Sequence, residues 1–337
     1  MSTDFKTAII GCGAISKTHI NAIHKNNIAK IVAICDIRED RLESNAALCP
    51  DARKFTDYKE MLKETDCDIV HICTPHYLHE EMAIAAMEAG HDVYLEKPAA
   101  MNPAGAKHIL EVSRRTGKKV CVSFQNRLVN STVAAKNIIE SGEIGKILGL
   151  KGIVTWDRCG AYYTQSGWRG TWEREGGGVL MNQSIHTIDL LYYLGGEIEK
   201  VEGSVALRKN RADIEVEDTA EATFYYKNGA IAIFYATNCH AISSPVEVEV
   251  VGEKGRLLIR DDILYRSIAN GALEKVTENN GLEVGKLVWG MGHACMIGNF
   301  YKSISGDKNV YYCDIEDAVV SLEIIQQIYA TSANKLR

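Results

Sequence analysis

The sequence predicts an α/β fold in two parts, a parallel sheet followed by an α+β domain whose large sheet is mainly antiparallel. Up to about residue 124, short and uniformly apolar segments alternate with amphipathic helical segments, as in a parallel sheet covered on both faces. Between residues 201 and 261 the apolar segments are joined by tight-turn signals instead. A chain of 337 residues is also long enough for two domains.

The first part contains five candidate strands. They cover residues 7–10, 31–36, 68–73, 92–95 and 119–124. Helical patterns separate them, for example 80–89, which ends at Gly90, a residue suited to a helix C-terminus. We therefore assign residues 1–124 to the first domain.

The second part begins with helices and continues with hairpins. We expect a helix over 131–141 and another from about Asn182 to Gly195. Asn228-Gly229 and the segment Gly252–Gly255 are turn signals between strands. The last helix is expected over 314–333. We assign residues 125–337 to this second domain and leave open that the last helix packs back on the first.

Composition and charge exclude several classes of partner. The net charge is −6 and no stretch is strongly basic, so nucleic acid and anionic membranes are poor candidates. The ten cysteines form no Cys-x-x-Cys pair, and several lie in apolar segments, which favours reduced, buried thiols in a cytoplasmic protein. The first residues lead into a short strand and do not resemble a signal peptide or a membrane span.

A dinucleotide fingerprint follows the first strand. Gly11 suits the tight turn, Gly13 allows close approach of a phosphate, and Ala14 and Ile15 begin the helix. Ser16 replaces the usual third glycine by another small residue. These features predict a Rossmann-type domain.

Asp36 ends the second strand 20 positions after Ser16, where an acid binds the ribose hydroxyls. It favours NAD over NADP, with Ile37 and Arg38 beside it as further cofactor contacts. Arg38 and Arg41 weaken the argument, because they are either solvated charges or partners for a 2′-phosphate.

Loops after other parallel strands should also line the cofactor crevice. The candidate cofactor residues there are Thr74, Pro75, His79, Glu96, Lys97 and Gln125. His76 and His79 would suit a metal, but no third ligand is apparent at a suitable spacing, so no metal is expected.

Lys97 and His186 are the candidate catalytic residues. Lys97 follows an apolar strand, and its ammonium can stabilise charge that develops on a reacting oxygen. His186 follows the glycine run 176–178, and an imidazole near neutral pKa suits removal of a hydroxyl proton. Asn182 and Asp189 lie four residues before and three after it, on one helical face, and Asn182 is a candidate substrate contact. The alternative for His186 is a satisfied core histidine.

An aromatic segment precedes the glycine run. Tyr163, Trp168 and Arg169 are candidate substrate residues, because aromatic faces and arginine suit sugar rings and anionic groups. The alternative is a packed loop whose tryptophans fill the domain interface. Gln125 and Arg127, at the end of the last parallel strand, are also within possible reach of the cleft.

Taken together, these motifs resemble the glucose–fructose oxidoreductase/inositol dehydrogenase (Gfo/Idh/MocA) family. The resemblance rests on the fingerprint, on Thr74-Pro75 with Leu78-His79, on Ala89–Val93 leading to Glu96-Lys97-Pro98, and on Gly176–Gly178 leading to His186 and Asp189. It implies an NAD-dependent oxidoreductase acting on a secondary alcohol of a sugar, inositol or nucleotide sugar, with Lys97 and His186 orienting the substrate and moving the proton. It also implies an open-faced sheet in the second domain that forms a homodimer or homotetramer.

One position departs from the family pattern. Many relatives have Asp where this chain has Asn182, and an amide cannot hold an imidazolium electrostatically. Two other activities stay open: a glycosidase that uses bound NAD for transient oxidation at C3, and a non-enzymatic NAD-binding regulator.

Overall fold

The computed structural model describes all residues except 1–4, 159, 210–211, 270, 279–290 and 336–337. It divides the chain into two compact units. The first contains Met1–Gln125 and Leu282–Val319, and the second contains Asn126–Gly281 and Val320–Arg337. None of the described helices is both long and apolar enough to cross a membrane.

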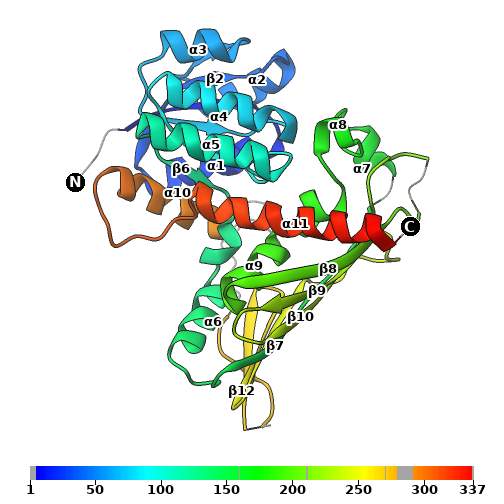
Figure 1. Ribbon diagram of the computed structural model, residues 1–337. Coiled ribbons are helices and arrows are strands. Elements are labelled where there is room, and N and C mark those ends of the chain that lie inside the picture. The colour runs from blue at the N-terminus through cyan, green and yellow to red at the C-terminus, as the bar shows by residue number, and fades with distance from the viewer. Residues whose placement is uncertain (1–4, 159, 210–211, 270, 279–290, 336–337) are drawn as a thin grey trace. The chain divides into compact units, whose positions relative to one another are not determined.

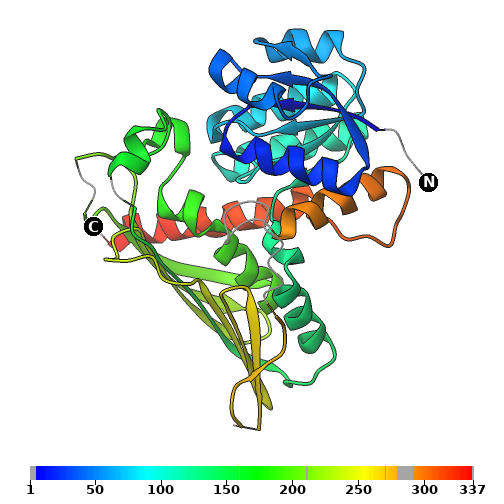
Figure 2. The same cartoon turned by 180° about the vertical axis from the view of Figure 1, so that it is seen from behind.

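The first unit is built on a parallel sheet of six strands. Their order is β3-β2-β1-β4-β5-β6, with β1 (Phe5–Ile10), β2 (Ala29–Cys35), β3 (Arg53–Phe55), β4 (Ile69–Ile72), β5 (Asp92–Leu95) and β6 (Val120–Val122). The connecting helices are α1 (Ala14–Asn26), α2 (Glu39–Ala46), α3 (Tyr58–Glu64), α4 (His79–Glu88) and α5 (Pro103–Thr116). α4 and α5 cover one face and α1 lies on the other (Figures 1 and 2). This confirms the predicted Rossmann-type sheet.

Local sequence explains where these elements end. Asn102 caps α5 by accepting the N–H of Gly105 at 3.0 Å, and Pro103 occupies the first turn. Gly117 ends the helix with φ +70°, a left-handed conformation that glycine adopts without strain. β3 was not predicted from the sequence, because three residues are too few to show a periodic pattern.

Helix α10 (Met291–Ile304) belongs to the first unit, which corrects the assignment of all residues after 124 to the second domain. α10 lies beside α1 (Figure 2), and Asn26 Nδ2 donates to the carbonyl of Ala294 at 2.8 Å. Ile297, Phe300 and Tyr301 are buried on the same helix. Helix α11 (Ile315–Lys335) begins in the first unit and continues in the second.

The second unit contains an eight-stranded sheet. Its order is β14-β13-β12-β11-β7-β10-β9-β8, with β7 (Ile147–Thr155), β8 (Ile198–Ala206), β9 (Thr219–Tyr226), β10 (Ile231–Thr237), β11 (Glu247–Gly252), β12 (Gly255–Arg260), β13 (Ile263–Ile268) and β14 (Glu274–Lys275). All neighbours are antiparallel except β7 and β10. The two predicted hairpins are confirmed as β9–β10, with Gly229 at φ +84°, and β11–β12.

Helices cover one face of this sheet. α6 (Asn130–Glu140), α9 (Ile185–Gly195) and the later part of α11 pack there, and Gln327 Oε1 of α11 accepts the N–H of Val201 at 3.1 Å. Two short helices, α7 (Gly160–Thr164) and α8 (Trp172–Glu175), lie in the loop between β7 and α9. β10 shows the consequence for the other face: its residues are alternately exposed and buried from Ile231 to Tyr235.

Candidate active site

The glycine turn after β1 is shaped for close approach. Gly11 has φ +91°, and an added Cβ would lie 2.7 Å from the backbone carbonyl of Cys73, so glycine is required. At Gly13 an added Cβ would meet no atom within 4 Å. Ala14 and Ile15 follow in the first turn of α1. The open space therefore lies at a helix N-terminus, where backbone N–H groups favour a phosphate.

Asp36 is held beside this turn by the backbone. Its Oδ2 accepts the N–H of Cys12 at 2.7 Å, and its Oδ1 accepts the N–H of Arg38 at 2.9 Å. The Arg38 guanidinium donates to both oxygens of Asp40, at 3.0 and 2.6 Å, and so is directed to that carboxylate. Ile37 is 87% exposed and offers an apolar surface next to Asp36. The arrangement suits ribose hydroxyls and an adenine ring better than a 2′-phosphate.

The loops after β4 and β5 are joined by His79. Its Nδ1 lies 2.7 Å from the carbonyl of Pro98 and its Nε2 lies 2.9 Å from the carbonyl of Thr74. A direct bond from His79 to a cofactor would require one of these contacts to break, so its role here is to order the loop. Next to it, the buried Thr74 hydroxyl has no hydrogen-bond partner among the described residues, and Pro75 is half-buried. An unpartnered buried hydroxyl is what a ligand-binding loop provides.

Glu96, which precedes Lys97, is fixed by buried histidines. His19 Nε2 lies 2.9 Å from Glu96 Oε1 and His293 Nε2 lies 3.4 Å from the same oxygen. Burial lowers the pKa of His19, so a neutral His19 donates from Nε2 and its Nδ1 accepts. The donor at that Nδ1 is His71, 2.9 Å away, whose Nε2 in turn accepts from Tyr301 at 2.9 Å. The chain of donors thus points toward Glu96.

The contacts of Glu96 with His19 and His293 anchor the backbone from which Lys97 projects. Burial alone would raise the pKa of Glu96, but hydrogen bonds from His19 and His293 hold that pKa well below its usual range. The ligand atoms of His19, Glu96 and His293 lie within 4.8 Å of one another, a spacing that a metal ion also accepts. Because they already contact one another, we assign them to positioning. The absence of a metal stays a prediction.

Gln125, the last cofactor candidate, is buried at the start of the short helix η2 (Gln125–Leu128), and Ser123 Oγ donates to its Oε1 at 3.5 Å. Together, the glycine turn, Asp36 and the Thr74 hydroxyl fit a bound NAD. They would hold its pyrophosphate, ribose and nicotinamide side respectively, and the cofactor would supply the hydride acceptor.

In the second unit, the glycine run is held against a buried glutamate. At Gly178 an added Cβ would lie 1.9 Å from the carbonyl oxygen of Glu217. The Glu217 carboxylate accepts the N–H groups of Gly178 and Leu180 at 3.0 Å and the hydroxyl of Tyr329 at 2.9 Å. Burial raises the pKa of Glu217 to about 7. These contacts begin a π-helical turn, η3 (Val179–Gln183), which was not predicted.

The turn changes the expected geometry around His186. Asn182 lies in η3, whereas His186, 3% exposed, lies in the first turn of α9, so the expectation of one regular helix is corrected. Asp189 forms a buried ion pair with Arg127, with N–O distances of 2.8 and 2.7 Å, and accepts from Ser321 Oγ at 3.1 Å. Arg127 thus packs in the core of the unit and does not serve the cleft.

Arg169 and Trp168 form an aromatic and cationic stack. The Arg169 guanidinium lies 4.5 Å from the ring centre of Tyr162 and 4.9 Å from that of Trp168. Arg169 Nε is buried and has no hydrogen-bond partner among the described residues. Tyr162 Oη also accepts from Gln183 Nε2 at 3.0 Å and from Asn182 Nδ2 at 3.4 Å. The stack therefore adjoins the polar groups of η3.

Tyr163 is the candidate substrate residue that the structure corrects. It is 1% exposed, packs with Ile214 and Val216, and its hydroxyl accepts from Asn238 Nδ2 at 2.8 Å. Its neighbour Tyr162 instead lies next to Asn182. Two adjacent tyrosines on a five-residue helix point in different directions, and the sequence carries no signal that distinguishes them.

Glu175 was missed by the sequence analysis. It is fully buried, its Oε2 accepts the N–H of Gly170 at 2.5 Å, and its Oε1 accepts from Asn182 Nδ2 at 2.6 Å. Burial raises the pKa of Glu175 to about 7. Its place directly before Gly176 was the available signal, but Glu173 two residues earlier is exposed and looks the same in the sequence.

Comparison with known families agrees with both units. Residues 5–124 match the oxidoreductase family, NAD-binding Rossmann fold, and residues 132–258 match the GFO/IDH/MocA C-terminal domain. The uncharacterized oxidoreductase YrbE of Bacillus subtilis is 31% identical over 258 residues, which are 76% of this chain and 73% of that protein.

Two further relatives cover nearly the whole chain. The D-glucoside 3-dehydrogenase of Escherichia coli is 26% identical over 100% of this chain and 97% of its own length. The WlbA dehydrogenase from Bordetella pertussis, solved with NADH and UDP-GlcNAcA, is 29% identical, covers 98% of this chain and 97% of its own, and superposes with a TM-score of 0.85. With both domains matched and the cofactor turn in place, the chain belongs to the Gfo/Idh/MocA family of NAD-binding oxidoreductases.

Proposed function

We propose that this enzyme oxidises a secondary hydroxyl of a sugar derivative that carries an anionic group, as a nucleotide sugar or a sugar acid does. The observation that carries the proposal is the Arg169 stack. A buried guanidinium nitrogen has no acceptor among the described residues, and the guanidinium lies within 5 Å of two aromatic ring centres. Aromatic rings suit a sugar face, and arginine suits a carboxylate or phosphate. The D-glucoside 3-dehydrogenase supports a sugar substrate, and the WlbA structure solved with UDP-GlcNAcA supports an anionic sugar derivative.

Lys97 and His186 carry the proton chemistry in this proposal. Bound NAD would supply the acceptor for the hydride that leaves the carbon bearing the reacting hydroxyl. His186 takes the proton from that hydroxyl, and the Lys97 ammonium donates a hydrogen bond to the same oxygen as its charge develops. Asn182 binds a neighbouring hydroxyl and so fixes the sugar ring.

A substrate screen tests the proposal directly. The purified protein with NAD is offered neutral sugars, inositols, sugar acids and nucleotide sugars, and NADH formation is read from its absorbance. We expect NADH with an anionic sugar derivative. NADH formed only with neutral sugars would contradict the claim that the substrate carries an anionic group. Product formed without NADH would contradict the proposed dehydrogenase activity.

Arg169→Ala tests the anion contact. Loss of a charge-assisted hydrogen bond should raise the KM for the anionic substrate roughly 10–100-fold, while NAD affinity stays unchanged. Arg256→Ala, at an exposed arginine on β12, is the control and should leave KM unchanged. An unaltered KM in Arg169→Ala with a lowered Tm would show that the stack only packs the loop.

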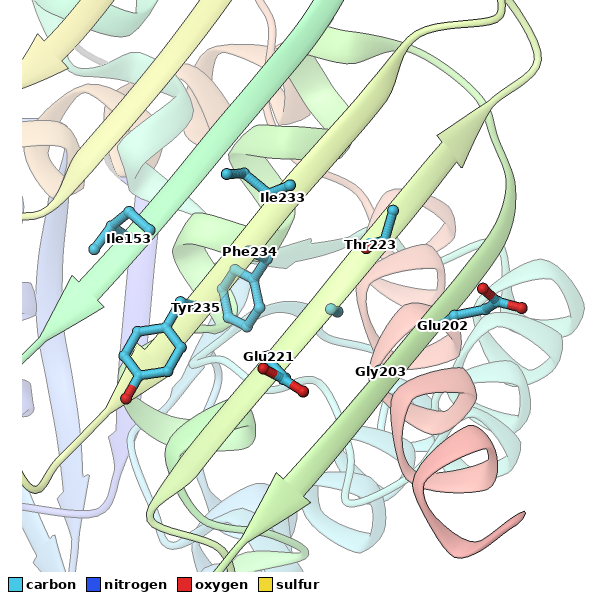
Figure 3. Close-up of a pocket in the computed structure, with 9 residues that line it drawn as sticks. Ile153, Glu202, Gly203, Glu221, Thr223, Ile233, Phe234 and Tyr235 are labelled. Carbon is cyan, nitrogen blue, oxygen red and sulfur yellow. The ribbon is translucent and has the colours of Figure 1, made fainter. Parts of the chain in front are cut away.

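We also propose that two copies of the chain associate through the uncovered sheet face. Ile231, Ile233 and Tyr235 of β10 are 47%, 55% and 38% exposed on that face. Tyr235 pairs with Ile153 of β7, and these side chains line a pocket with Thr223 and Glu221 of β9 (Figure 3). A row of exposed apolar side chains bordered by polar ones, on a sheet face that no described helix covers, favours a symmetric, self-complementary contact.

The oligomeric state in solution tests this contact. Ile233→Glu should shift the mass measured by light scattering toward the monomer, because it places a charge in the apolar patch. Leu48→Glu, at a similarly exposed apolar residue of the first unit, should not. A monomeric wild type would contradict the proposal. We further propose a cytoplasmic location, which the nine described cysteines, all free and mostly buried, support.

A further inference from the structure

Asn182 replaces the acid that the family resemblance leads us to expect, and its amide can present either a donor or an acceptor to the substrate. A carboxylate offers only acceptors. Which end of the amide faces the substrate therefore decides whether this chain keeps the chemistry of the acid. The neighbours of Asn182 in the second unit decide that orientation.

Glu175 fixes one end of the amide. Its Oε1 lies 2.6 Å from Asn182 Nδ2 and accepts a hydrogen bond from it. The other carboxylate oxygen accepts the N–H of Gly170 at 2.5 Å, so the carboxylate itself cannot rotate without losing a buried bond. Turning the amide over would place its oxygen against a carboxylate oxygen.

A second chain of amides points the same way. Asn238 Nδ2 donates to Gln183 Oε1 at 2.9 Å, which directs the NH2 group of Gln183 to Tyr162 Oη at 3.0 Å. Tyr162 Oη also receives Asn182 Nδ2, at 3.4 Å. Both amides of η3 thus direct their NH2 groups at oxygens of the loop that holds α7 and α8.

We propose that Glu175 is a positioning residue that holds the NH2 end of Asn182, so that the Asn182 carbonyl oxygen accepts a hydrogen bond from a substrate hydroxyl. Asn182 then offers the substrate an acceptor, as a carboxylate would, without a charge of its own. The proposal rests on the proposed function, since it assigns a role in binding the substrate hydroxyl.

Conservative substitutions reverse the geometry in a defined way. In Glu175→Gln the N–H of Gly170 still needs an acceptor, so the Gln oxygen stays there and the Gln NH2 group faces Asn182. Asn182 must then turn its oxygen inward and its NH2 group to the substrate. We expect kcat/KM to fall roughly 10–100-fold, with NAD affinity unchanged. Glu173→Gln, at the exposed acid on the same helix, is the matched control and should keep wild-type values.

Asn182→Asp supplies the rescue test. Alone, it sets a second carboxylate beside Glu175, and the pair must share a proton, so activity falls and its pH profile shifts. Combined with Glu175→Gln, the Gln NH2 group donates to one oxygen of Asp and the other oxygen faces the substrate. We expect the double variant to exceed both single variants in kcat/KM.

The groups facing Glu175 set the pH readout. They are Arg169, which favours its ionised form, Glu217, which disfavours it, the donors on Gly170 and Asn182, and the phenols of Tyr163 and Tyr329. The ionisation of Glu175 should therefore add to the rise in wild-type kcat/KM around neutral pH. Glu175→Gln should lose this added part and keep the part that comes from His186 as the base.

The outcomes separate this proposal from the proposed function. Suppose that the wild type oxidises the sugar and that the fold-loss of kcat/KM in the double variant equals the two single fold-losses multiplied. The two residues then act independently, and the role of Glu175 is overturned. The Tm values of the same variants, measured without substrate, test the Glu175–Asn182 contact even if no sugar is oxidised. If the two substitutions change Tm independently, the contact itself is overturned. A wild type with no sugar turnover but a rescued Tm in the double variant would refute the proposed substrate and leave the contact standing.

Discussion

At the scale of single residues, the partner of each charged group decides what it can do. Asp36 has its two oxygens held by backbone N–H groups, so its position is independent of any flexible side chain. Arg38, the residue that weakened the expectation of NAD, is paired with Asp40. The sequence placed Asp36 correctly at the end of β2 because that position follows from chain order, whereas the Arg38–Asp40 pairing depends on side-chain geometry.

Asp36→Ala should therefore reduce the preference for NAD. Loss of a charge-assisted hydrogen bond to the ribose should narrow the difference in binding free energy between NAD and NADP by about 1–3 kcal/mol. Direct titration of both cofactors measures this, with Asp51→Ala, at an exposed acid of the same unit, as the control. A wild type that binds NADP more tightly than NAD would contradict the role of Asp36.

At the scale of elements, the sequence was reliable where a pattern is local. Helix α6 and the hairpin at Asn228-Gly229 follow from periodicity and turn chemistry, which act over a few residues. The π-turn η3 could not be predicted, because it depends on Glu217. This residue accepts the N–H groups of Gly178 and Leu180, which lie 39 and 37 residues before it in the chain. Helix α10 was misassigned for the same reason: its partner α1 lies at the other end of the chain.

Glu217 also gives the second unit a dependence on pH. Its pKa is raised by burial to about 7 in the folded state, above its value of about 4.5 in the unfolded chain, so the folded state binds the proton more tightly. The contribution of this group to stability is fully present below pH 4.5 and is lost as pH rises through 7.

The side chain of Gln cannot ionise, so Glu217→Gln does not lose stability as pH rises through 7. Relative to the wild type, the variant should gain unfolding free energy between pH 5 and pH 8, on the order of 2 kcal/mol. Denaturant unfolding at the two pH values measures the difference, and Glu221→Gln, at an exposed acid of β9, should show none. A difference between Glu217→Gln and wild type that stays constant with pH would contradict the buried ionisation.

At the scale of the whole molecule, the proposed reaction assigns different residues to each of the two units. The first provides the cofactor turn, Asp36 and the anchored Glu96-Lys97 pair, and the second provides His186, Asn182 and the Arg169 stack. The family motifs were visible in the sequence because their residues are adjacent in the chain. Their supports, such as His293 beside Glu96 and Glu175 beside Asn182, were not, because only the folded chain brings them together.

The central claim is that Lys97 and His186 act together on the reacting hydroxyl. The measurement is turnover of the oxidised sugar by Lys97→Ala, His186→Ala and the double variant, with NAD affinity and Tm measured alongside and His108→Ala, at an exposed histidine, as the control. Each single variant should lose roughly 10²–10⁴-fold in turnover, and the double variant should lose little more than the worse single one. Near-normal turnover in His186→Ala, with an unchanged pH profile, would contradict the assignment of His186 as the base.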